Sequence, residues 1–186
     1  MHQRSRPPFP DLGSFLSYLD RQDEVLRIDK PVSMHLELTE IHRRIIAQGG
    51  PVLRLGAPLT GDGSVSSMPV VTNLFGTCER VAAGLGTDRA GLAGLGEMLA
   101  WMRSPRPPRT LGEARSLLPA ARGALSSRPK VTGRAAWHEV GPDFSQLPVQ
   151  TCWPEDAGPL ITWPVVVTRP PGDDDPASYN LGIYRM

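Results

Sequence analysis

The sequence predicts a mixed α/β domain over residues 11–103, then a connector (104–134) and the opening strands of an all-β domain (135–186). Three observations lead to this order. Apolar residues follow helical and strand periods in turn up to residue 103. Prolines and arginines then concentrate in the connector, and beyond it only strand-like runs remain. Residues 1–10 are charged and Pro-rich, so we expect a disordered arm.

Helices are predicted where apolar residues recur three or four positions apart between start and stop signals. Asp11 is placed to cap the first helix, and Gly49 and Gly50 end the second. Five helices are predicted. The first begins after residue 11 and the second after residue 31, and the other three cover residues 77–84, 92–102 and 111–118.

Strands are predicted where β-branched residues alternate with polar ones or form short apolar runs. The predicted strands cover 24–29, 51–55, 68–75, 136–140, 160–169 and 179–185. Between the last two lies P-P-G-D-D-D-P-A-S, whose Pro, Gly and Asp residues are typical of a loop.

Composition narrows the class of protein. The 186 residues are 40% hydrophobic, which is enough for a buried core, and 20 basic residues balance 19 acidic ones. The two cysteines form no C-x-x-C pair, so a zinc or disulfide framework is not expected. The sequence shows no signal peptide and no apolar run long enough to span a bilayer. We therefore expect a cytoplasmic protein without an integral membrane segment.

Three features invite a site but have simpler interpretations. Glu37, Glu40 and His42 suggest a metal site, yet their spacing favours a solvated helix face on which Glu40 pairs with Arg44. The run Asp173–Asp175 lacks the alternation of a calcium loop, so an exposed turn is favoured. The basic connector is the best argument for nucleic-acid binding, but no aromatic residue interleaves its charges.

Five blocks of sequence, in order, resemble UbiD-type decarboxylases, which use prenylated FMN to remove CO₂ from aromatic or α,β-unsaturated acids. The two most specific blocks are L-P-V-Q-T-C-W-P-E-D-A-G-P-L-I-T-W (147–163) and N-L-G-I-Y-R-M (180–186). The others are E-L-T-E-I-H-R-R, P-V-V-T-N-L-F-G-T and R-S-P-R-P-P. The resemblance covers the chain from Asp11 onward.

The resemblance implies that residues 135–186 open a flavin-reductase-like split β-barrel, and it assigns four site residues. Asn180 matches a ligand of a divalent cation, usually Mn²⁺, that bridges to the flavin phosphate, with K⁺ as a further candidate. Ile183, Tyr184 and Arg185 match the stretch that contacts prenylated FMN. Arg185 would be the catalytic residue: it would hold the substrate carboxylate and tune the pKa of a carboxylic acid. The family's His and Glu metal ligands and its acid–base glutamates come later than Met186.

Strand geometry constrains these roles. Five steps of about 3.3 Å separate Asn180 from Arg185 by roughly 16 Å, so the segment can reach both ends of a nucleotide. Because five is odd, a regular strand points the two side chains to opposite faces. Both can serve one cofactor only if the strand is irregular or Asn180 lies before it begins, and at Gly182 we expect a bulge or a close backbone approach.

We expect the chain to be the N-terminal part of a non-oxidative decarboxylase of the polyprenyl-hydroxybenzoate type, as in ubiquinone biosynthesis. The resemblance implies a homo-oligomer and a flavin prenyltransferase that supplies the cofactor. This chain alone is expected to show little or no turnover. Two rival hypotheses remain: a non-catalytic oligomerisation module derived from the family, and a nucleic-acid binder.

Overall fold

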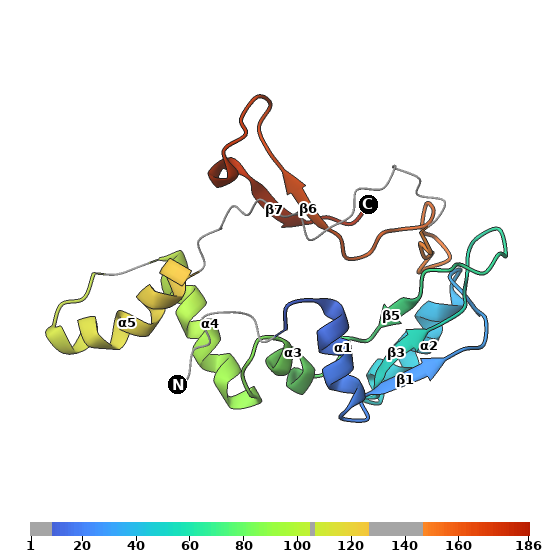
Figure 1. Cartoon of the computed structure of the whole chain (residues 1–186), viewed down its shortest axis with the longest axis horizontal. Coiled ribbons are helices and arrows are strands. Elements are labelled where there is room, and N and C mark those ends of the chain that lie inside the picture. The colour runs from blue at the N-terminus through green and yellow to red at the C-terminus, as the bar shows by residue number, and fades with distance from the viewer. Residues whose placement is uncertain (1–8, 105–106, 127–146) are drawn as a thin grey trace. The chain divides into compact units, whose positions relative to one another are not determined.

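The computed structural model describes residues 9–104, 107–126 and 147–186 (Figure 1). The chain divides into two compact units. One unit comprises Met1–Arg21 and Phe75–Lys130, and the other Gln22–Leu74 and Val131–Met186. Most of the predicted disordered arm, the end of the connector and the strand predicted at 136–140 lie outside the described residues.

Helices form the first unit: α1 (Leu12–Asp20), α3 (Cys78–Gly84), α4 (Arg89–Arg103) and α5 (Leu111–Ser126). The predicted cap of α1 is confirmed, because the Asp11 carboxylate accepts a hydrogen bond from the Ser14 N–H at 2.7 Å. Phe15 of α1 stacks on Phe75, with ring centroids 5.9 Å apart. A Cβ on Gly84 would lie 3.2 Å from the Phe75 ring, so this glycine lets α3 approach the aromatic pair.

Helix α5 is longer than predicted, since it continues from Leu111 to Ser126 rather than ending at residue 118. Pro119 directly follows the predicted end, and proline removes one backbone donor from a helix interior. The helix nevertheless runs on through this position.

A three-stranded sheet forms the middle of the second unit. Its strands are β1 (Val25–Ile28), β3 (Val52–Leu55) and β5 (Val70–Thr72), in the order β1-β3-β5. The β1–β3 pair is parallel and the β3–β5 pair is antiparallel. Helix α2 (Glu37–Ala47) lies between β1 and β3 in the sequence, as the crossover of a parallel pair requires. The predicted mixed α/β class is confirmed for this part.

The core of the second unit lies between this sheet, α2 and a second strand pair. Strands β2 (Val32–Ser33) and β4 (Pro58–Leu59) pair in parallel, and neither was predicted because two residues show no period. Ile41 and Ile45 of α2 pack against the buried cluster, as the helical period predicted. The buried cluster consists of Val32, Met34, Leu38, Leu53 and Leu55.

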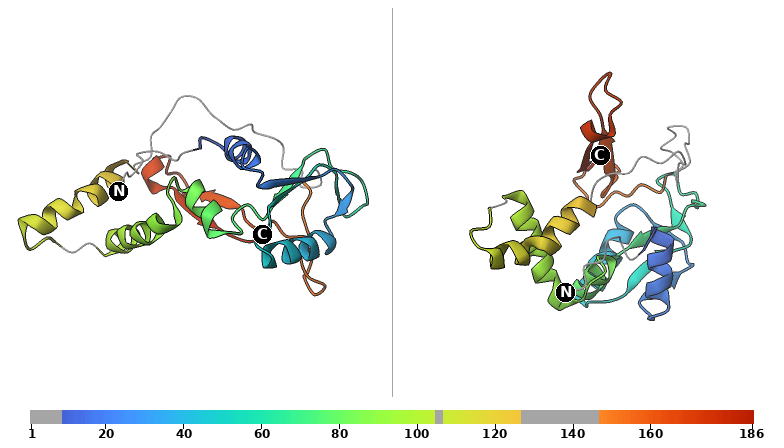
Figure 2. Two further views of the ribbon diagram at one scale, coloured as in Figure 1. Left: turned by 90° about the horizontal axis from the view of Figure 1, so that it is seen from below. Right: turned by 60° about the vertical axis from the view of Figure 1, so that its left-hand side comes forward.

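The C-terminal part of the second unit is an antiparallel hairpin of β6 (Val165–Thr168) and β7 (Asn180–Ile183). Both predicted strands are confirmed, although each is shorter than predicted. A 3₁₀ turn (Pro176–Ser178) lies in the long connection between them, which extends away from the strand ends (Figure 2). Among the described residues, no helix is both long and apolar enough to cross a bilayer.

Candidate functional site

The four predicted site residues lie on β7 and directly after its end. Asn180 is the first residue of the strand and pairs across the hairpin with Thr168. Ile183 is the last residue of β7, and Tyr184 and Arg185 follow it. All four predicted residues are exposed, so this segment presents them to a ligand rather than to the core.

The bulge predicted at Gly182 is wrong, because the ladder of the described hairpin is unbroken from Asn180 to Ile183. A close approach does occur at this glycine, but with a side chain. A Cβ on Gly182 would overlap the ring of Tyr184, which lies two residues away on the same face. Glycine is therefore needed here to let the Tyr184 ring lie against the strand.

The irregularity lies in the partner strand. Ile161 and Met186 exchange both backbone hydrogen bonds, with N···O distances of 2.7 and 3.3 Å, so they face each other. Between this pair and the last pair of the β6–β7 ladder, three residues (162–164) face two (184–185). One extra residue on one strand makes a β-bulge. Pro164 lies in it, and a residue without an N–H suits a position outside the ladder.

The hairpin has one apolar and one mixed face. The apolar face consists of Val165, Val167, Leu181 and Ile183, whose exposed fractions range from 57% to 68%. Asn180, Gly182 and Tyr184 alternate with these residues and lie on the other face. Arg185 lies two residues beyond the end of β7, outside the paired ladder.

The donor chemistry near Asn180 fits one side of a cation site. Asn180 offers a neutral amide oxygen, and the Thr168 hydroxyl lies directly across the ladder. Hard divalent cations take six or more oxygen ligands, commonly including carboxylates and phosphate. Among the described residues, no group of three or more His, Cys, Asp or Glu side chains is arranged to hold a metal. The described residues at this place therefore offer only one amide oxygen and one hydroxyl oxygen, fewer ligands than such a cation takes.

The acidic run in the hairpin connection is a turn, as predicted. The Asp173 carboxylate accepts the Asp175 N–H at 2.9 Å, and the Asp175 carboxylate accepts the Ala177 N–H at 2.9 Å. Arg169 forms an ion pair with Asp174. These carboxylates are therefore engaged in holding the turn.

The acidic face of α2 is an ion-pair surface. Glu40 accepts hydrogen bonds from Arg43 and Arg44, which lower its pKa to about 2. The predicted pair of Glu40 with Arg44 is confirmed, at 2.7 Å. His42 is half-buried on this helix: its Nδ1 contacts the Thr72 hydroxyl, and burial lowers its pKa. The spacing of His42 from Glu37 along the helix gave no sign of this contact, because β5 is distant in the sequence.

A hydrogen-bonded path that the sequence did not predict leads from the N-terminal α/β part to the site strand. Thr151 donates its N–H to the Met34 carbonyl at 3.0 Å, and its own carbonyl accepts the Leu36 N–H at 2.9 Å. The next residue back, Gln150, accepts the Leu160 N–H at 2.8 Å. Because these bonds involve only the backbone, side-chain patterns carry little trace of them.

The Gln150 side chain strengthens the same path. Its amide Nε2 donates to the Thr162 hydroxyl at 3.2 Å, beside the Ile161–Met186 pair. On the other side of Thr151, the Asp156 carboxylate accepts the N–H groups of Cys152 and Trp153, at 3.1 and 2.9 Å. Residues 150–162 are thus fixed by specific polar contacts rather than by apolar burial.

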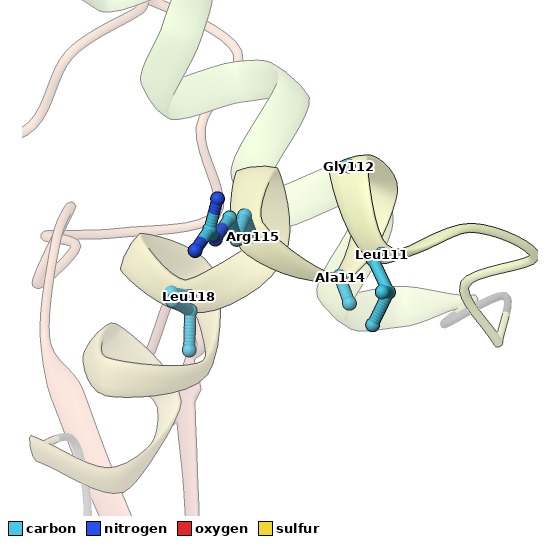
Figure 3. A pocket seen from close by; sticks show the side chains of 5 residues that line it. All are labelled: Leu111, Gly112, Ala114, Arg115 and Leu118. Carbon is cyan, nitrogen blue, oxygen red and sulfur yellow. The ribbon is translucent and has the colours of Figure 1, made fainter.

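A hollow of about 360 Å³ lies on α5, in the first unit (Figure 3). Its lining comes from the first two turns of that helix and includes none of the predicted site residues. The lining residues are Leu111, Gly112, Ala114, Arg115 and Leu118. This hollow is therefore separate from the candidate site.

Comparison with known families gives two matches along the chain. The 3-octaprenyl-4-hydroxybenzoate carboxy-lyase N-terminal domain (UbiD_N) matches residues 16–99. The 3-octaprenyl-4-hydroxybenzoate carboxy-lyase Rift-related domain (UbiD) matches residues 125–186, which include β6 and β7.

Solved structures of the same class share the fold. The UbiD-class enzyme HmfF from Pelotomaculum thermopropionicum, in complex with FMN, is 23% identical with a TM-score of 0.59, and the match covers 94% of this chain and 33% of HmfF. Vanillic acid decarboxylase from Sedimentibacter hydroxybenzoicus, in an open form, is 23% identical with a TM-score of 0.66, covering 95% of this chain and 36% of that one. The chain thus spans about a third of the length of these enzymes.

Proposed function

Because the chain belongs to the UbiD family of carboxy-lyases, we propose that it forms the N-terminal part of a decarboxylase dependent on prenylated FMN. The observation that carries the proposal is N-L-G-I-Y-R on an exposed strand, within the segment that matches the family's second domain. An evolved dimeric form of HmfF has been solved in complex with prenylated FMN, and the match covers 94% of this chain. The proposed substrates are aromatic or α,β-unsaturated acids of the polyprenyl-hydroxybenzoate type.

Each site residue has a proposed role that suits its chemistry. Asn180 gives an amide oxygen to a divalent cation, Mn²⁺ by preference, that also binds the flavin phosphate, with K⁺ as a further cation. Ile183 and Tyr184 contact the flavin. Arg185 binds the substrate carboxylate through two parallel N–H···O bonds, which a planar guanidinium is shaped to make.

Prenylated FMN supplies the electron-accepting chemistry of decarboxylation when it is bound. The part played by this chain is to hold and orient. Asn180 is the first residue of β7 and Arg185 lies two residues beyond its end, so the proposed cation contact and the proposed substrate contact are separated along this segment. The acid that returns a proton, and the remaining cation ligands, are proposed to belong to the further length that family members possess.

The proposal extends to the assembly and the supply of the cofactor. Residues 135–186 are proposed to open a split β-barrel, with 11–103 as the preceding domain, 104–134 as a connector and 1–10 as a disordered arm. A flavin prenyltransferase would supply the cofactor to a cytoplasmic homo-oligomer. In ubiquinone biosynthesis the reaction would remove CO₂ from a polyprenylated hydroxybenzoate.

A decarboxylation assay tests the proposal. We expect the 186-residue chain, reconstituted with prenylated FMN and Mn²⁺, to bind the flavin weakly and to release no CO₂ above background. Arg185→Ala should weaken the residual flavin affinity further, because Arg185 belongs to the stretch that is proposed to contact the flavin. Turnover by this chain alone would contradict the proposed division of the site.

A second candidate function is a non-catalytic oligomerisation module. It is favoured by exposed leucines on helices of the first unit: Leu99, Leu111, Leu118 and Leu125. Apolar side chains on one unit are a usual feature of surfaces that become buried on association. Light scattering coupled to size-exclusion chromatography decides, because a strictly monomeric, folded chain excludes this function.

A further inference from the structure

Helix α2 begins with a strained turn. Leu36 has φ 64° and ψ −39°, and the Glu37 N–H donates to the His35 carbonyl at 2.7 Å. This is a γ-turn with positive φ, a rare conformation that a residue with a Cβ adopts only when its surroundings impose it. The Glu37 carboxylate also accepts the Ser33 N–H at 2.7 Å, so the turn is closed from both sides.

The strained turn directs its free backbone groups at one residue, Thr151. With the Glu37 N–H turned back onto His35, the Leu36 N–H points outward and donates to the Thr151 carbonyl at 2.9 Å. The Met34 carbonyl accepts the Thr151 N–H at 3.0 Å. Met34 is itself buried in the core cluster, so the hydrogen bonds to Thr151 start from the buried core of the second unit.

From Thr151 the hydrogen bonds continue to the residue after Arg185. Gln150 holds Leu160 through its carbonyl, and its side chain holds the Thr162 hydroxyl. Ile161, between these two, exchanges both backbone bonds with Met186. The β-bulge at residues 162–164 lies in the next step of the ladder, opposite Arg185. The backbone on both sides of the bulge is therefore tied to a defined point.

We propose that the Leu36 turn and Thr151 are positioning elements for Arg185. The hydrogen bonds that run from Met34 and Leu36 through Thr151, Gln150 and Ile161 to Met186 form a relay, and through this relay the N-terminal α/β core fixes the position of Arg185. This inference rests on the proposed function for its meaning, but its physical content is a coupling between two distant parts of the fold. The N-terminal α/β part is therefore needed for more than its own fold, because the relay also orders the segment that follows β7.

Residue-resolved hydrogen exchange on the 186-residue chain tests the relay. Thr151→Pro removes the N–H that bonds to Met34 but suits an extended backbone. The exchange protection of the Ile161 and Met186 amides should fall at least tenfold, while that of Leu53 in β3 stays within twofold. Thr151→Val keeps both backbone bonds and should match the original chain. Unchanged protection at Ile161 and Met186 in Thr151→Pro would overturn the relay.

A second variant keeps the test decisive if Thr151→Pro fails to fold. Thr162→Val is nearly isosteric and removes only the hydroxyl that accepts from Gln150. It should lower the protection of Ile161 and Met186 at least threefold, and no change there would refute the relay. An FMN titration of the original chain is run in parallel. Absence of flavin binding would count against the proposed function alone, because the exchange experiment needs no ligand.

Discussion

Leu26 and Leu53 pair across β1 and β3 but differ in burial, since Leu26 is 47% exposed and Leu53 is 0% exposed. Leu53→Ala should lower the free energy of unfolding by about 2–5 kcal/mol, because it leaves a cavity in the core. Leu26→Ala, the matched control, should cost about 1 kcal/mol or less. Urea denaturation of both variants measures the difference. Equal losses would show that the core is not centred on β3.

His42 predicts a pH dependence of stability. Burial lowers its pKa in the folded chain from the ordinary value of 6.5, so the unfolded chain binds the proton more readily. Stability should therefore fall as the pH drops below about 6.5, until the folded pKa is reached. Urea denaturation at pH 7.5 and at pH 5.5 should show that the free energy of unfolding falls less on acidification for His42→Gln than for the original chain. Equal losses would mean that His42 is solvated when folded.

At the scale of elements, the hairpin depends on Gly182. Gly182→Ala should displace the Tyr184 ring, because the new methyl group takes the space that the ring fills. The ring resonances of Tyr184 should shift while those of Tyr18 in α1 stay in place. Gly158→Ala is the control, since a Cβ there meets nothing within 4 Å. Unmoved Tyr184 resonances in Gly182→Ala would contradict the described packing.

The elements that the sequence predicted are those with a period or a cap of their own. Asp11 and the spacing of Phe15 were enough for α1, and alternation was enough for β1. Strands β2 and β4 escaped prediction because two residues have no period and their pairing depends on the core around Met34. The end of α5 was missed because the concentration of prolines and arginines led to the prediction of a connector with only a short helix at 111–118.

Only part of the candidate site could be predicted, because some of its features depend on how two strands pair and not on a pattern within one strand. The motif indicated where Asn180 and Arg185 lie along the chain, but the irregularity that their odd spacing led us to expect at Gly182 was wrong as a bulge, because the ladder of the described hairpin is unbroken there. The position of the bulge depends on the register between two strands, which side-chain patterns do not specify here. Pro164 was the one available signal, because proline inside a strand-like run often marks a bulge or an edge.

At the scale of the whole molecule, both family domains are represented, yet the chain spans only 33% of the HmfF structure. The apolar face of Val165, Val167, Leu181 and Ile183 remains more than half exposed. An enzyme site of the proposed kind needs carboxylates that the described residues do not gather at β7. We therefore propose that this chain contributes one strand of a cofactor site and the chain of backbone hydrogen bonds that positions it.

The most direct test is an NMR titration of the ¹⁵N-labelled chain with FMN and Mn²⁺. We predict that the amide resonances of Asn180 and Thr168 broaden most, that those from Ile183 to Arg185 shift, and that both effects are weaker in Asn180→Ala. Broadening confined to the Asp173–Asp175 turn, or no response of β7 at millimolar FMN, would contradict the claim that this strand carries part of a flavin–metal site.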